Sequence, residues 1–285
     1  MQICSIGSII NNVRKYTRGE EPVKWTEEAE NAIGKVPFFV RKIVRKKVEE
    51  EARQAEARTV TIRHVRTSQQ RFLRNMEDEI QGYRVETCFG PQGCRNRAAA
   101  DDDLADKIDK ILASRNLKRF LRETIPGKIK MHHEFRISIS DCPNACSRPQ
   151  IVDLGLLGAC RPEVTGEQCS ECGACASACA EDAVSFPDIS RSAVPVIDRA
   201  GCLQCGQCAT VCPTGTIIHG KRGYRILVGG KLGRHPRLGM ELPEIYSSSD
   251  VLDIVERCID HFMLHNRQGE RFGDILARTG MNFLF

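Results

Sequence analysis

The sequence lacks the long apolar segments that membrane proteins need. No run in its 285 residues approaches the roughly 18 consecutive apolar residues that span a bilayer. Residues 1–10 carry no basic leader, and Asn11 and Asn12 interrupt their short apolar stretch, so we expect no secretory signal. The sequence therefore predicts a cytoplasmic protein without a membrane span.

A strong net charge is also missing. The 42 basic residues nearly balance the 37 acidic ones, and the formal net charge is +5. This excess is too small to indicate nucleic acid as a partner. It suits a protein that receives an anionic substrate or an anionic cofactor.

Cysteine, by contrast, is abundant, with 15 residues. A disulfide framework needs an oxidising compartment and usually a short secreted chain, whereas metal or cluster ligation needs reduced thiols. Because no secretory signal is expected, the spacing of the cysteines has to decide between these explanations.

Eight cysteines lie in two runs of the same spacing within residues 166–218. The runs are Cys169-x2-Cys172-x2-Cys175-x3-Cys179 and Cys202-x2-Cys205-x2-Cys208-x3-Cys212. In this spacing three thiolates of a run bind one cubane, and the fourth binds the cubane of the other run. The spacing therefore assigns one [4Fe–4S] cluster to Cys169, Cys172, Cys175 and Cys212, and a second to Cys202, Cys205, Cys208 and Cys179. Zinc ribbons, the alternative, use two pairs and not two tandem sets of four.

Four further cysteines form two close pairs, Cys88-x5-Cys94 and Cys142-x3-Cys146. Neither spacing is that of a ferredoxin or a zinc finger. Together with residues 135–146, 153–158 and 229–237, these pairs resemble the sulfite and nitrite reductase family over roughly residues 84–285. A two-cluster ferredoxin placed inside this region is similar to the dissimilatory and anaerobic branches of that family.

The resemblance implies a third [4Fe–4S] cluster and a sirohaem. Its cluster ligands would be Cys88, Cys94, Cys142 and Cys146, and Cys146 would also bridge to the sirohaem iron. The implied activity is the six-electron reduction of sulfite or nitrite. Electrons would arrive through the ferredoxin insert from a donor protein or subunit, and we expect an oligomer or a complex.

Sirohaem carries many carboxylates, so its pocket needs cations. The candidates are Arg95, Arg97, Lys231, Arg234 and Arg237, with ordinary surface charge as the alternative for each. Lys231 and Arg234 lie in the Gly-rich stretch that resembles the family.

Two further residues are candidates for catalysis. The family often has Lys-x-Lys just before the C-x3-C strand, where this sequence has Glu134 and Arg136. We expect Arg136 to bind the substrate anion and His133 to donate protons near neutral pH. The alternative for His133 is a routine residue at a strand edge.

The sequence also leaves a non-catalytic function open. Members of the family have two similar halves, and the earlier half supplies arginines to the active site, whereas this chain matches the later half. Either a small reductase works without the earlier half, or another subunit completes the pocket. The alternative is an iron–sulfur electron-transfer subunit of a larger redox complex.

We expect an α+β fold, a mixed sheet with helices, in five segments. These are a tail (1–20), a helical domain (21–75), two parts of the reductase domain (76–165 and 219–285) and the ferredoxin insert (166–218) between them. Residues 25–30 and 36–41 and the charged helix that follows resemble the small C-terminal domain of light-independent protochlorophyllide reductase over about residues 22–70. The resemblance implies a cover for a tetrapyrrole or a docking element, and the alternative is a helical cap that buries core.

Hydrophobic periodicity predicts the main elements of the fold. Helices are expected from Pro37 onward, at 104–112 and at 251–263, and strands at 135–139, 151–157 and 224–228. Three cysteines belong to no motif, and we assign them no function. Cys258 is expected to be buried in the last helix, Cys160 to follow a strand, and Cys4 to lie in the tail.

Overall fold

The computed structural model describes residues 23–99, 101, 103–186 and 194–285. Cys4 and the predicted tail lie outside these residues. The chain divides into two compact units, Met1–Met76 and Glu77–Phe285. Among the described residues, no helix is long and apolar enough to cross a membrane.

The first unit is a small helical domain with a two-stranded parallel sheet. Its elements are β1 (Lys24–Trp25), α1 (Glu27–Gly34), α2 (Phe38–Gln54), β2 (Thr59–Val60) and the first part of α3 (Ile62–Glu79), which continues into the second unit. The predicted helix after Pro37 is confirmed, since Pro37 is the N-cap of α2. The core of this unit contains Ala29, Ile33, Val48, Ala52 and Val60.

The second unit is built on a five-stranded mixed sheet. Its strands are β3 (Tyr83–Thr87), β4 (Phe135–Ser140), β5 (Leu154–Val164), β8 (Ile217–Val228) and β9 (Met240–Glu241), in the order β3-β4-β5-β8-β9. β3, β4 and β5 are parallel, whereas β8 and β9 are each antiparallel to their neighbour. The predicted α+β class is thereby confirmed.

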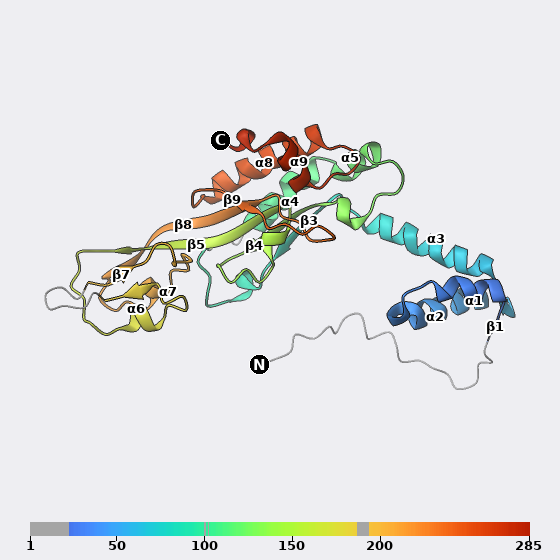
Figure 1. Ribbon diagram of the computed structural model, residues 1–285, viewed down its shortest axis with the longest axis horizontal. Coiled ribbons are helices and arrows are strands. Elements are labelled where there is room, and N and C mark those ends of the chain that lie inside the picture. Colours follow the sequence, from blue (N-terminus) through green and yellow to red (C-terminus); the bar gives the residue numbers. More distant parts are fainter. Residues whose placement is uncertain (1–22, 100, 102, 187–193) are drawn as a thin grey trace. The chain divides into compact units, whose positions relative to one another are not determined.

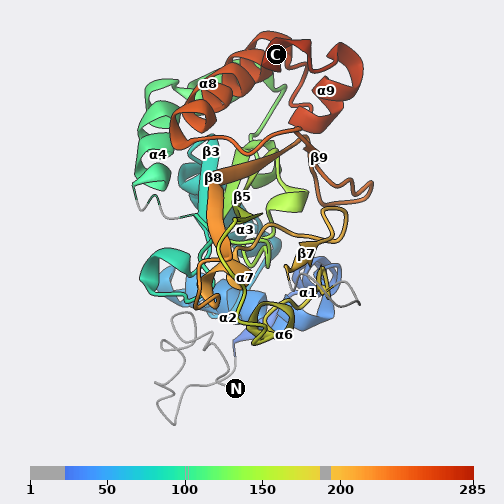
Figure 2. The ribbon, with the colours of Figure 1, turned by 90° about the vertical axis from the view of Figure 1, so that its left-hand side faces the viewer.

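Helices bury the apolar face of this sheet. They are α4 (Leu104–Ser114), α5 (Leu117–Thr124), α8 (Ser248–His265) and α9 (Phe272–Thr279). Figure 2 shows α4 and α8 side by side, with α9 next to α8. Phe135 of β4 is fully buried, with its ring centroid 5.2 Å from that of Phe262 and 5.1 Å from that of Phe272. The predicted helices at 104–112 and 251–263 are therefore core elements.

Short 3₁₀ turns connect several of these elements. They are η1 (Gly90–Gln92), η2 (Met131–His133), η3 (Pro149–Ile151) and η4 (Asn282–Leu284). Ile151 therefore ends a turn, and β5 begins only at Leu154, later than the sequence predicts. Cys160 lies within β5 and does not follow it, so that prediction is wrong.

β5 and β8 form a long antiparallel ribbon that extends beyond the sheet into the insert (Figure 1). The insert contains α6 (Ala174–Ser177), α7 (Gln207–Thr210) and the antiparallel pair β6 (Val184–Ser185) and β7 (Val196–Ile197). β8 starts at Ile217 and not near Tyr224, because Ile217 and Ile218 pair with the far end of β5. The ribbon thus links the insert to the sheet.

Candidate metal centres

Two neighbouring loops carry the first set of thiols. Cys88 and Cys94 lie in the loop after β3, and Cys142 and Cys146 lie in the loop after β4. Because β3 and β4 are parallel neighbours, their carboxyl ends meet at one edge of the sheet. Burial raises the pKa of the Cys142 thiol, and the charges of Cys146, Cys94 and Cys88 raise it further. All three thiols therefore lie within electrostatic reach of Cys142.

Asp141 joins the two loops. Its backbone N–H donates to Cys88 Sγ (3.3 Å), and its carbonyl oxygen accepts from the backbone N–H groups of Ala98 (2.8 Å) and Ala99 (3.2 Å). Its buried carboxylate accepts from Arg97 Nε at 2.7 Å. No sequence motif singles out Asp141, whose one visible signal is its position directly before Cys142.

Two glycines let the chain approach Asp141 closely. A Cβ at Gly90 would overlap the Asp141 carboxylate, and a Cβ at Gly158 would overlap its backbone carbonyl. Any larger residue would therefore push Asp141 away from these segments. The loop geometry at Cys142 depends on both small residues.

Cys146 differs from Cys142 in its exposure. The Cys142 side chain is buried, whereas Cys146 is exposed and accepts a hydrogen bond from Asn144 Nδ2 at 2.9 Å. The turn between them places Ala145 in the left-handed region, at φ 56°. A group that approaches from outside the chain can reach the Cys146 sulfur.

The second set of thiols lies at one end of the insert. Burial raises the pKa of the Cys175 thiol, and Cys212 and Cys169 raise it further. The pKa of Cys172 is lowered, first because the backbone N–H of Ala174 donates to its sulfur. All four thiols of this set line one small cavity. The structure thus brings together the four cysteines that the spacing groups.

The third set joins the second run to the last cysteine of the first run. Burial raises the pKa of Cys208 to about 11, and Cys202, Cys205 and Cys179 contribute to the rise. The four thiols line a cavity of about 550 Å³, which Cys142 also lines. This set therefore faces the loop of the first set. Within the described residues, no three His, Cys, Asp or Glu side chains converge on a site for a single metal ion.

The five predicted sirohaem-binding cations fall into two groups. Arg97 pairs with Asp141, and Lys231 Nζ (2.6 Å) and Arg237 (2.7 Å) both donate to the Asp274 carboxylate. Arg95 and Arg234 have exposed side chains. Three of the five cations are therefore engaged with acids of the chain itself.

The two predicted catalytic residues lie near the start of β4, whereas the cysteine loop follows its end. Arg136 alternates with Ser138 and Ser140 on one face of the strand, and its guanidinium donates to Glu86 at 3.1 Å. Ser138 Oγ donates to the Ser147 carbonyl at 2.7 Å, so the loop after Cys142 folds back over that face.

His133 is held as a neutral imidazole. Its Nδ1 accepts a hydrogen bond from the backbone N–H of Lys130 at 3.0 Å. Burial lowers its pKa to about 4, and the charges of His132, Lys130 and Arg271 lower it further. Its function as a proton donor stays a prediction, in which the neutral imidazole first takes up a proton.

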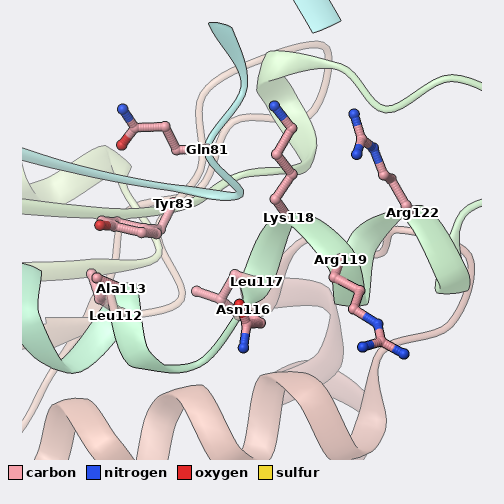
Figure 3. A pocket seen from close by; sticks show the side chains of 9 residues that line it. All are labelled: Gln81, Tyr83, Leu112, Ala113, Asn116, Leu117, Lys118, Arg119 and Arg122. Carbon is pink, nitrogen blue, oxygen red and sulfur yellow. The ribbon is translucent and has the colours of Figure 1, made fainter. Parts of the chain in front are cut away.

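A separate pocket of about 410 Å³ lies at the start of β3. Figure 3 shows the side chains that line it. Its lining includes Tyr83, at the start of β3, and the cations Lys118, Arg119 and Arg122 of α5. None of the predicted site residues lines it. It is a basic surface pocket apart from the three thiol sets.

Comparison with known proteins places most of the chain in one family. The model of the nitrite and sulphite reductase 4Fe-4S domain matches residues 84–285. The model of the proto-chlorophyllide reductase 57 kD subunit matches residues 25–67. Both resemblances found in the sequence are confirmed.

Among curated proteins, the chain is similar to the coenzyme F420-dependent sulfite reductase of Methanocaldococcus jannaschii. The identity is 35% over 150 residues, which cover 52% of this chain and 23% of that protein. It is also similar to one subunit of the anaerobic sulfite reductase of Salmonella typhimurium, with 28% identity over 105 residues, 37% of this chain and 26% of that protein. The aligned regions thus span about a quarter of the length of these relatives.

Among solved structures, dissimilatory sulfite reductase I (DsrI) aligns with a TM-score of 0.46 and 18% identity, and the alignment covers 70% of this chain and 50% of that one. The family assignment itself rests on the domain match, which extends from β3 to the C-terminal residue. From residue 84 onward, this chain is a member of the nitrite and sulphite reductase 4Fe-4S domain family.

Proposed function

We propose that the chain holds three [4Fe–4S] clusters and a sirohaem, and that it reduces sulfite, or alternatively nitrite, by six electrons. The observation that carries the proposal is that the Cys88/Cys94 loop and the Cys142/Cys146 loop follow the parallel neighbours β3 and β4 and are joined by the hydrogen bond from the Asp141 N–H to Cys88 Sγ. Cys146 is the exposed member of this set, as a thiolate shared with an external macrocycle has to be.

The thiol environments fit iron–sulfur clusters. Backbone N–H groups donate to Cys88 Sγ from Gly90 (3.2 Å), to Cys179 Sγ from Ala183 (3.2 Å) and to Cys212 Sγ from Ile217 (3.3 Å). Such hydrogen bonds stabilise thiolate charge and tune cluster potentials. When bound, the clusters and the sirohaem would supply electrons singly to an oxyanion.

The cations support the binding of an anionic cofactor and substrate. We assign Arg95 and Arg234, which are exposed, to the sirohaem carboxylates. Lys231 and Arg237 would exchange Asp274 for a carboxylate of the cofactor, which is feasible because partly exposed ion pairs contribute little stability. Arg97 would remain with Asp141.

Substrate handling is assigned to Arg136 and His133. The Arg136 guanidinium lies on the sheet face that the cysteine loop covers, and it would attract the oxyanion after release from Glu86. His133 lies before β4 and would act in proton supply at a greater distance.

We further propose that electrons enter through the insert from a donor protein or a partner subunit. The Salmonella typhimurium relative is a subunit of an anaerobic sulfite reductase, which supports function together with a partner subunit. Reduced thiols as cluster ligands favour the cytoplasm as the compartment.

The test is a visible spectrum of the anaerobically purified protein, followed by sulfite-dependent oxidation of a reduced dye. A sirohaem band and dye oxidation are expected. Cys146→Ser should abolish the magnetic coupling between haem and cubane in EPR. Unchanged coupling in Cys146→Ser would contradict the assignment of the bridge.

One observation favours a second candidate, a non-catalytic electron-transfer subunit. Arg97, Lys231 and Arg237 are paired with acids of the chain, so a working sirohaem pocket has to reorganise two of these pairs. Clusters without tetrapyrrole, in protein prepared with sirohaem supplied, would identify this candidate as the function.

A further inference from the structure

The one buried cysteine of β5 makes a specific contact that no cysteine motif explains. Cys160 is 1% exposed, and its Sγ lies 3.2 Å from Nδ1 of His219 on β8. The other ring nitrogen, Nε2, lies 3.4 Å from Oγ1 of Thr210, which ends α7. The exposed imidazole therefore covers the buried thiol and connects β8 to the helix that contains Cys208.

This thiol–imidazole pair supports the ligand loop of the third set. The Cys160 backbone N–H donates to the Gln204 carbonyl at 2.7 Å, and Cys160 forms a β-bridge with Cys205. A Cβ at Gly206 would lie 3.0 Å from the Cys160 sulfur and 3.2 Å from Nδ1 of His219. The loop thus rests directly on the pair, and Gly206 permits the close approach.

The same thiol also contacts the loops of the first set. Cys160, Ala98 and Cys142 form one small buried cluster, separate from the main core. The cavity at the third set is lined by Cys142 and Asn144 as well. Cys160 therefore lies between the ligand loop of the third set and a ligand of the first.

The second set of thiols offers a contrast. Its cavity is lined by its own four cysteines and by residues of the insert and the start of β8, such as Phe186, Pro195 and Ile217. The contacts of the third set are therefore the ones that connect the insert to the sheet loops.

We propose that Cys160 and His219 are positioning residues that hold the ligand loop of the third set against that of Cys142 and so govern electron exchange between these two sets. In that exchange the cluster held by the third set would give up one electron and be oxidised, and the cluster held by the first set would accept it and be reduced, with no bond made or broken. The inference rests on the proposed clusters and is independent of sirohaem and of the oxyanion.

The experiment uses the full chain, reconstituted anaerobically with iron and sulfide. Cys205→Ser first identifies the EPR signal of the cluster at the third set. Redox titrations followed by EPR then give the equilibrium constant for the transfer of one electron from the cluster at the third set to the cluster at the first set. Cys160→Ala and His219→Phe should each shift this constant by about fivefold, the equilibrium weight of one net hydrogen bond. Cys160→Ser should restore most of the difference, because a hydroxyl keeps a hydrogen bond to the imidazole.

Cys258→Ala is the matched control, since Cys258 is also fully buried but lies in α8 and belongs to the main core. It should leave the constant unchanged, and the potential of the second set should stay constant in every variant. An unchanged constant in both Cys160→Ala and His219→Phe at full iron content would overturn the inference, as would an equal shift of all three potentials. If Cys160→Ala fails to fold, His219→Phe decides, because that side chain is exposed.

Discussion

The insert and the sheet domain hold their cysteines in different ways. In the insert, three cysteines of each set come from one short run, and the fourth comes from the other run. In the sheet domain, two pairs lie on separate loops that meet because β3 and β4 are parallel neighbours. The loops of the insert alone bring its cysteines together, whereas the first set, which contains Cys142, assembles only when the sheet is formed.

Substitution of one cysteine ligand should show the difference between the sheet domain and the insert most clearly. We expect Cys142→Ser to remove the iron of the first set and to lower dye-linked sulfite reduction by more than about 100-fold, because even outer-shell changes at metal sites cost about 10–100-fold. Cys172→Ser should remove iron from the second set alone and keep the sirohaem band. Iron analysis should show the loss of one cluster in each variant, and spectra and dye assays should distinguish them. Equal losses of the sirohaem band and of dye-linked activity in the two variants would contradict the distinction.

Crowding at Asp141 tests the dependence of the first set on tertiary packing. A methyl group at Gly158 would overlap the Asp141 carbonyl, so Gly158→Ala should lower the unfolding free energy by about 1–3 kcal/mol. The control is Gly166→Ala, because no atom lies within 4 Å of a Cβ there, and its effect should stay below about 0.5 kcal/mol. Chemical unfolding gives both values. Equal unfolding free energies in the two variants would show that the Asp141 loop accommodates the methyl group without loss of stability.

Substitutions of Arg97 and Arg95 test which of the two cations stabilises the fold and which binds the cofactor. Arg97→Gln removes a charged donor from the buried Asp141 carboxylate and should cost about 1–3 kcal/mol of unfolding free energy. Arg95→Gln should leave stability unchanged and weaken sirohaem binding in a titration. The reverse result, with haem loss and full stability in Arg97→Gln, would assign Arg97 to the cofactor.

Substitution of His133 should give the smallest effect, a change in how the unfolding free energy depends on pH. Its pKa of about 4 in the folded chain lies below the usual 6.5, so the unfolded chain binds more protons between these values. The unfolding free energy should therefore fall as the pH is lowered from 7 to 5.5, and less steeply in His133→Gln. Parallel unfolding curves for the two proteins would mean that this imidazole does not titrate differently on folding.

The sequence predicted the helices and strands with a strong hydrophobic periodicity. It missed features that depend on pairing with distant segments of the chain. The strand at Phe135 and the helix at Val251 have clear periodicity, and both were found. The start of β8 at Ile217 was missed, since it depends on pairing with the far end of β5. The contacts of Asp141 were missed for the same reason, because its partners Ala98 and Arg97 lie on another loop.

By itself, the sequence determined the family and the fold class. It also predicted the grouping of the insert cysteines, because spacing within a short run limits which thiols can share a cluster. Only the tertiary structure decided that Cys146 is exposed while Cys142 is buried, and that Arg97 belongs to Asp141. It alone placed Cys160 between two ligand loops. Burial and pairing join residues far apart in the chain, and no local pattern of residues encodes them.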